Sequence, residues 1–184
     1  MKGYKGMYAY KFRLFSDEVE GLTRDYEILS NQTFKDFHDI IIQSLGLSGT
    51  ELASFYTTDT KWEKQTEITL MDMNDENDED EATAMPKEVM AKAVIRDFID
   101  DPHQKLIYEY DFLHLKTFYI EFVKAFEGKN NTKYPICTHK VGELPKNNVQ
   151  ILDDFDDLDL GLDQDEDFYD EEDFDGLDSE IEIE

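Results

Sequence analysis

The chain has 184 residues, and its 45 aspartates and glutamates against 18 lysines and arginines give a formal net charge of −27 and a pI near 4.2. Binding to nucleic acids and to anionic lipids depends largely on Lys and Arg, so this balance excludes both as general partners. A hydrophobic content of 40% is enough to build a core, which excludes a wholly disordered chain.

The single cysteine, Cys137, excludes an intrachain disulfide and a cysteine-rich zinc ribbon. A chain without disulfides fits the reducing cytoplasm. The sequence has no apolar run near the roughly 20 residues that span a bilayer, and residues 1–15 alternate in polarity instead of forming a signal-peptide core. We therefore expect a soluble cytoplasmic protein.

Charge divides the chain into two parts. Residues 151–184 contain 18 acidic and no basic residues, whereas residues 1–150 contain 27 acidic and 18 basic residues. Like-charge repulsion keeps a segment of this composition extended. We therefore predict an α+β domain at 1–150 and a disordered acidic tail at 151–184.

The first half of the domain predicts a hairpin and a helix. Residues 7–15 alternate with the period of a half-buried strand, and residues 22–30 form a second β-leaning segment after a short polar turn. Thr33 is placed to cap a helix that ends at Gly46. Its apolar residues recur at steps of three and four: Phe34, Phe37, Ile41 and Leu45.

The second half predicts a second hairpin, a second helix and the central strands. Residues 51–73 return to strand patterns, and seven of the ten residues at 72–81 are acidic, which predicts a solvated loop. Pro86 opens a segment that predicts a helix until Asp100 and Asp101. The most β-rich segments, 105–112 and 116–126, are expected at the centre of the sheet. A long loop at 127–150, rich in Gly, Asn and Pro, is expected to pack across the sheet edge.

This order predicts an α+β fold. It consists of a mainly antiparallel sheet of about six strands, in the order ββαββαββ, with two helices packed on it and the acidic tail after it.

Local motifs in the same order resemble the plasmid pRiA4b ORF-3-like family. They are YKFRL, IIIQSLGLSGTELASF, the paired strands KLIYEYDF and FYIEFV, and YPICTHKVGELP, within residues 5–150. The family's Y-x-Y-D-F-G-D-x-W-x-H signature is similar to Tyr108 to Phe112, but its polar second half is replaced, with Leu113 and His114 in place of Gly and Asp. The resemblance implies an α+β domain and a mobile-element context, and it implies no reaction.

Two small groups of residues are candidates for chemistry. Asp111, between apolar neighbours, is either a partly buried carboxylate with a raised pKa or an acceptor of backbone hydrogen bonds at a strand end. Cys137 and His139 form a C-x-H pair that could hold zinc with His114 or His103, or Cys137 is a small buried apolar residue.

Other motifs carry weaker signals. Trp62 either anchors a partner or closes over the sheet edge. The segment YKFRLFS superficially resembles a serine recombinase strand, but three arginines in the whole chain are too few to hold DNA. Two acidic runs have the spacing of calcium ligands without the remaining EF-hand positions: Asp72, Asn74, Glu76 and Asp78, and Asp163, Asp165 and Asp167.

The tail is the clearest functional candidate, because ten large apolar residues are interleaved with its acidic ones. We predict a non-enzymatic interaction protein whose residues 151–184 bind a basic protein partner, without nucleic acid, membrane or cofactor. No catalytic, cofactor-binding or metal residue is assigned. The alternative is a metal-dependent or acid/base enzyme module centred on Asp111, His114, Cys137 and His139. A third possibility is that the tail only keeps the protein soluble.

Overall fold

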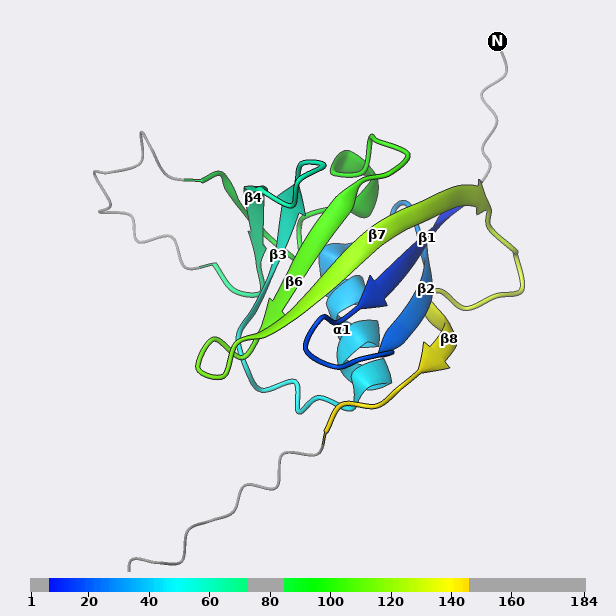
Figure 1. Ribbon diagram of the computed structural model, residues 1–184. Coiled ribbons are helices and arrows are strands. Elements are labelled where there is room, and N and C mark those ends of the chain that lie inside the picture. The colour runs from blue at the N-terminus through cyan, green and yellow to red at the C-terminus, as the bar shows by residue number, and fades with distance from the viewer. Residues whose placement is uncertain (1–6, 73–84, 146–184) are drawn as a thin grey trace, which may run out of the picture. The chain divides into compact units, whose positions relative to one another are not determined.

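The computed structural model describes residues 7–72 and 85–145, and these form one sheet of eight strands with a helix behind it (Figure 1). The elements in chain order are β1 Tyr8–Phe15, β2 Thr23–Leu29, α1 Phe34–Leu45, β3 Ala53–Thr58, β4 Lys64–Thr69, β5 Lys87–Val89, the 3-10 turn η1 Ile95–Asp97, β6 Lys105–Tyr110, β7 Lys116–Glu127 and β8 Ile136–Val141. The spatial order is β5-β4-β3-β6-β7-β1-β2-β8.

Three antiparallel hairpins and the first helix confirm the predictions for those segments. The hairpins are β1–β2, β3–β4 and β6–β7, and β6 and β7 lie near the centre of the sheet as expected. The side chain of Thr33 accepts from the backbone of Asp36 in a capping box, and Gly46 ends α1 in the left-handed conformation.

The predicted second helix at 86–101 is wrong. This segment forms β5, which pairs in parallel with β4, followed by an irregular stretch and η1. Its backbone is held from outside: the N–H of Met90 donates to Thr69, and the carbonyls of Met90 and Ala93 accept from Lys35 and Phe34 at the start of α1. The first N–H groups of a helix have no acceptor within the helix, and here two carbonyls of this segment serve as acceptors for two of them.

The apolar residues of this segment are therefore buried without forming a helix. Met90, Ala93, Ile95 and Ile99 are all buried and sit three, two and four residues apart. Apolar contacts with the core impose that spacing on an irregular backbone, so the hydrophobic period alone is misleading here.

The six-strand antiparallel sheet with two helices is also wrong, because the described residues form a mixed sheet of eight strands with one helix. The two additional strands are the edges, β5 and β8. The expected loop at 127–150 contains β8, which pairs with β2. Both edge strands are short and mostly exposed, so they lack the alternation that marks a half-buried strand.

Some predictions fall outside the described residues. These are the acidic loop after Asp72, the calcium-like spacings after that residue, and the tail with its boundary at 150.

The core lies between the sheet and α1 and is built largely from aromatic rings. Phe37 of α1 stacks on Phe55 of β3 with a centroid distance of 5.4 Å, and Phe12 of β1 lies 5.1 Å from Phe37. Tyr108 of β6 lies 4.6 Å from Phe55. Large rings packed in this way bury much apolar surface per residue, which lets one helix cover this side of the sheet.

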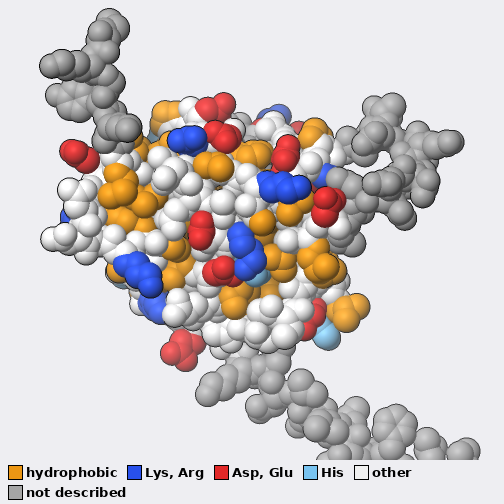
Figure 2. Space-filling view, turned by 180° about the vertical axis from the view of Figure 1, so that it is seen from behind, with side chains coloured by type: hydrophobic (Ala, Val, Ile, Leu, Met, Phe, Trp, Pro, Cys, Tyr) orange, Lys and Arg blue, Asp and Glu red, His pale blue; other side chains and the backbone are white. Residues whose placement is uncertain are grey.

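The side of the molecule that carries α1 has a mixed surface. Viewed from behind, charged side chains of both signs alternate with hydrophobic ones (Figure 2). Of the described helices, none is long and apolar enough to cross a membrane.

Candidate functional site: the uncovered face of the sheet

Asp111 lies in the β6–β7 turn with a positive φ of 59°. Its Oδ1 accepts from the backbone N–H groups of Leu113 and His114, each at 3.3 Å, and its Oδ2 lies 3.1 Å from Nδ1 of His114 and 3.6 Å from Nζ of Lys116. Burial raises the pKa of this carboxyl, and the hydrogen bonds from the backbone and imidazole of His114 lower it. The lowering effects are larger together, so the pKa lies below its ordinary value. Asp111 is therefore an ionised acceptor that shapes the turn.

A pair of substitutions tests this structural role of Asp111. We expect Asp111→Ala to lower the Tm by roughly 5 °C, because alanine tolerates the left-handed conformation poorly and supplies no acceptor. Asparagine tolerates the left-handed conformation and keeps a side-chain acceptor, so the Tm of Asp111→Asn is expected to stay within about 2 °C of that of the wild type. Thermal unfolding followed by circular dichroism measures both, and equal losses for the two variants would contradict the assignment.

Cys137 and His139 lie together on β8, away from Asp111 and His114. The Cys137 thiol donates to the carbonyl of His139 at 3.4 Å, and burial raises the pKa of this thiol, which disfavours the thiolate that binds metals. β8 lies three strand spacings, about 14 Å, from β7, the strand that follows the turn that holds His114. The four residues form two separate pairs, and in 7–72 and 85–145 no three His, Cys, Asp or Glu side chains are placed to hold a metal ion.

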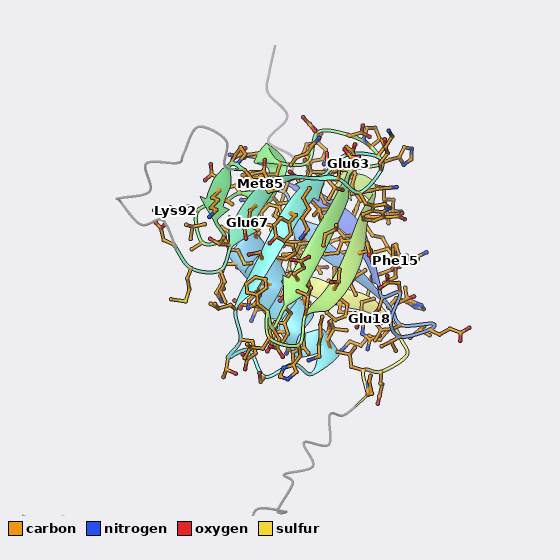
Figure 3. The ribbon with its side chains drawn as sticks, turned by 60° about the vertical axis from the view of Figure 1, so that its left-hand side comes forward. Phe15, Glu18, Glu63, Glu67, Met85 and Lys92 are labelled. Atoms are coloured by element: carbon orange, nitrogen blue, oxygen red, sulfur yellow. The ribbon has the colours of Figure 1, made fainter. Side chains whose placement is uncertain are left out.

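The face of the sheet turned away from α1 carries the larger group of functional side chains. None of the described helices covers this side, which faces the viewer in Figure 1 and which we call the open face. Strand alternation and pairing place charged and aromatic side chains on it: Lys11, Arg13, Phe15, Asp25, Ser54, Tyr56, Lys64, Glu67, Lys105, Glu109 and Tyr119. In Figure 3, Glu67 and Phe15 are labelled near opposite edges of the sheet.

A polar cluster occupies the β4–β3–β6 part of the open face. One oxygen of Glu67 accepts from the hydroxyls of Ser54 at 2.9 Å and Tyr56 at 3.1 Å. Nζ of Lys64 donates to Glu109 at 2.5 Å and lies 3.8 Å from the centroid of the Tyr56 ring. Burial, together with the two carboxylates, raises the pKa of Tyr56, so its hydroxyl stays protonated and donates.

A second ionic cluster lies across β1 and β2. Arg13 donates two hydrogen bonds to the carboxylate of Asp25, at 2.7 and 2.9 Å, and Nζ of Lys11 lies 3.0 Å from the same group. The hydrogen bond from Arg13 is the main cause that lowers the pKa of Asp25 to about 2, against the opposing effect of burial. Asp25 is therefore ionised at all physiological pH values.

An aromatic cluster of Phe15, Tyr119 and Trp62 lies between these two groups. Phe15 and Tyr119 are stacked at 5.7 Å, and Trp62 meets the ring of Tyr119 edge-on at 5.0 Å and that of Phe15 at 6.2 Å. Nζ of Lys105 lies 4.5 Å from the centroid of the Trp62 ring. The indole is half-buried, so Trp62 lies over the sheet and still presents part of its surface to solvent.

The β3–β4 turn holds Trp62 in place. One carboxylate oxygen of Asp59 accepts from the backbone N–H groups of Lys61 at 2.7 Å and Glu63 at 2.9 Å, and the carbonyl of Asp59 accepts from the N–H of Trp62. This fixes Trp62 at a φ of 69°. The aromatic cluster is therefore preorganised before any partner arrives.

The open face is suited to binding more than to proton transfer. Its carboxylates are paired, and every buried side-chain nitrogen or oxygen of the described part of the chain has a hydrogen-bond partner. The pKa of Asp25 moves down and that of Tyr56 moves up, so both groups keep one protonation state near neutral pH, where an acid or base catalyst would titrate.

Sequence patterns do not identify the open face as a site, because its residues come from six strands. The alternation of residues 7–15 was a usable signal, since it places Lys11, Arg13 and Phe15 on one face. The strand order that joins them to Tyr119 and Trp62 depends on long-range pairing.

The comparisons with known proteins place this fold and its family. The crystal structure of a protein of unknown function from Methanosarcina mazei Go1 is similar, with a TM-score of 0.59 and 21% sequence identity over 74% of this chain and 71% of that chain. At this identity the likeness concerns the fold alone. No curated protein matches the chain. The family model of the plasmid pRiA4b ORF-3-like protein matches residues 8–179, beyond the 5–150 covered by the motifs, and the chain therefore belongs to this family.

Proposed function

We propose that this protein is a non-enzymatic cytoplasmic interaction protein that binds a basic protein partner. The open face supplies a preorganised aromatic anchor, and residues 151–184 supply charge that attracts the partner. A mobile-element context remains a prediction from the family resemblance.

The observation that carries this proposal is the aromatic cluster on the open face. Trp and Tyr side chains contribute most strongly to protein interfaces when they are central and rigid. Trp62 is held by its turn and by the rings of Phe15 and Tyr119, so little side-chain entropy is lost when a partner covers it.

Charge supports a basic partner. The chain has a formal net charge of −27, and 18 acidic residues lie in 151–184. Complementary charge speeds association and excludes acidic competitors, and its contribution falls with ionic strength. On the open face, Arg13 and Lys64 are paired with the carboxylates of Asp25 and Glu109, which reduces the positive charge there that would repel such a partner.

The proposal is tested by affinity capture from host lysate with the full chain and with residues 1–150, at low and at high salt. We expect a basic protein that the full chain retains at low salt and releases at high salt, with weaker retention on residues 1–150. Retention that is equal on both forms and independent of salt would contradict an electrostatic role for residues 151–184.

A further inference from the structure

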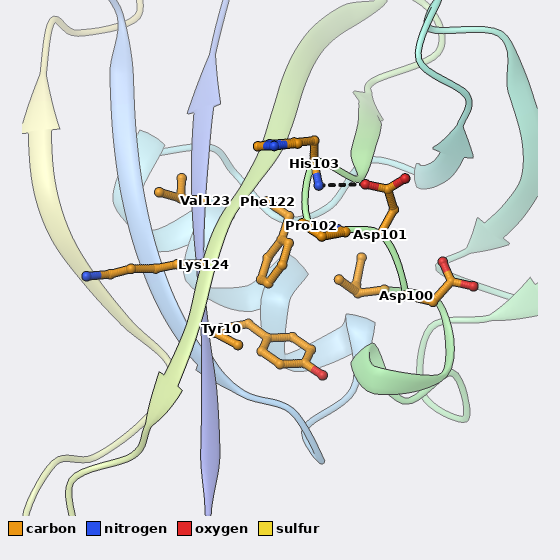
Figure 4. Close-up of a pocket in the computed structure, with 10 residues that line it drawn as sticks. Tyr10, Asp100, Asp101, Pro102, His103, Phe122, Val123 and Lys124 are labelled. Carbon is orange, nitrogen blue, oxygen red and sulfur yellow. Dashed lines mark hydrogen bonds between the residues drawn. The ribbon is translucent and has the colours of Figure 1, made fainter.

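A second feature of the domain is a pocket beside the upper part of β7, with a volume of about 440 Å³ (Figure 4). It is open to solvent and lies between β1, β7 and the loop that leads into β6. A volume of this size is within the range of natural ligand sites. It contains none of the residues of the open face named above.

The floor of the pocket is aromatic and apolar. Tyr10 meets Phe122 edge-on with a centroid distance of 5.2 Å, and Ile99 completes the floor. Phe122 and Ile99 are buried, whereas Tyr10 is half-buried and turns part of its ring to the pocket. The Tyr10 hydroxyl makes no hydrogen bond within the described ranges.

The rim of the pocket carries negative charge. Asp100 and Asp101 are exposed side chains of the loop before β6. Lys124 also borders the pocket, but Figure 4 shows its side chain running away from Tyr10 and Phe122, and its Nζ lies over the ring of Phe126 at 6.0 Å. Two of the charged residues that line the pocket are therefore acidic, and the side chains of Asp100 and Lys124 both point away from Tyr10 and Phe122 in Figure 4.

The loop that carries this rim is fixed to the sheet. Oδ1 of Asp101 accepts from the N–H of His103 at 2.8 Å, and the N–H of Phe122 donates to the carbonyl of Gln104 at 2.9 Å. The acidic rim and the aromatic floor thus keep their relative positions without a ligand.

We propose that this pocket binds the cationic side chain of a lysine or arginine from the partner. The aliphatic stem packs on Ile99 and Phe122, the face of Tyr10 attracts the cation, and the two aspartates on the rim balance its charge. This inference rests on the proposed function only in taking the partner to be a basic protein. The pocket is formed by residues 10–125, so it does not require the tail.

Residue-resolved NMR of the full chain tests the pocket with N-acetyl-lysine methylamide as probe and N-acetyl-norleucine methylamide as its neutral counterpart. We expect the lysine probe to shift the amide signals of His103, Phe122 and Ala125, with a Kd on the order of a few millimolar. The norleucine probe should bind at least about fivefold more weakly. The absence of shifts at these amides, or equal shifts with both probes, would overturn the proposal.

Two isosteric double variants test whether the carboxylates of the pocket rim contribute to the binding of the lysine probe. Asp100→Asn with Asp101→Asn keeps an acceptor for the His103 N–H and is expected to weaken lysine-probe binding about fivefold. Glu18→Gln with Glu20→Gln removes the same charge from the exposed β1–β2 turn and should leave the pocket affinity within about twofold. Equal effects of the two pairs would overturn the role of the rim. Because the readout is at the pocket itself, a failed capture experiment leaves this result unchanged, and the two proposals fail separately.

Discussion

Replacing Arg24 with methionine is expected to lower the free energy of unfolding by about 3 kcal/mol. Arg24 is only 4% exposed, and no carboxylate of residues 7–72 or 85–145 pairs with it. Its guanidinium donates to the carbonyls of Thr23 at 2.9 Å, Val141 at 2.5 Å and Gly142 at 2.8 Å. Its Nε also reaches the carbonyl of Ser44 near the end of α1. Methionine keeps the apolar stem but leaves these carbonyls without their donor.

Urea unfolding measures this loss, and hydrogen exchange locates it. We expect the amide protons of β8 to lose protection first, because two of the Arg24 bonds hold the end of that strand. Arg96→Met is the matched control: Arg96 is exposed, and its Nε lies 3.6 Å from the exposed Asp97, so its effect should stay within about 0.5 kcal/mol. An Arg24 variant as stable as the Arg96 variant would show that the carbonyl contacts are not stabilising.

His38 is expected to make the protein less stable as the pH falls from about 7 to 4. The side chain is buried on α1, with Nδ1 2.9 Å from the hydroxyl of Tyr108. Burial, and to a lesser degree the charge of Lys35, lowers the pKa of His38 from 6.5 to about 4. Between these two values the unfolded chain binds more protons than the native one, so acid favours unfolding, by about 3 kcal/mol in total.

Urea unfolding at several pH values between 4 and 7 compares the wild type with His38→Asn. Asparagine stays neutral and keeps a polar group near the position of Nδ1, so the variant should lack about 3 kcal/mol of the acid-induced loss. Protonation of the many carboxylates affects both proteins alike and cancels in the difference. His103→Asn, at an exposed position, should retain the wild-type slope. Parallel slopes for the wild type and His38→Asn would contradict the burial argument.

The predictable part of the fold is the part where local signals agree with long-range packing. α1 has its cap at Thr33, its apolar stripe and its stop at Gly46 in the sequence, and each performs the expected role. The segment after Pro86 also has a composition and an apolar pattern that predict a helix, but its backbone hydrogen bonds go to β4 and α1. Nothing in the local sequence shows where those bonds go, so the predicted helix is replaced by β5 and η1.

The site residues also divide into those whose role the local sequence predicts and those whose role depends on long-range contacts. For Asp111, acceptance of backbone hydrogen bonds at a strand end was one of the two interpretations, and the structure supports it. The environments of Trp62, Tyr119 and Arg24 depend on strand order and on contacts across the sheet. A single sequence does not report these contacts, so it predicts neither the aromatic cluster nor the hydrogen bonds from Arg24 to the backbone carbonyls.

The most direct test of the central claim measures the affinity of the captured basic partner for Trp62→Leu by isothermal titration calorimetry. At low salt, where the full wild-type chain retains the partner, we expect this variant to bind at least tenfold more weakly than the wild type. Phe112→Ala, at an exposed aromatic of the β6–β7 turn, should bind as the wild type does. If Trp62→Leu binds as tightly as the wild type, the open face is not the interaction surface.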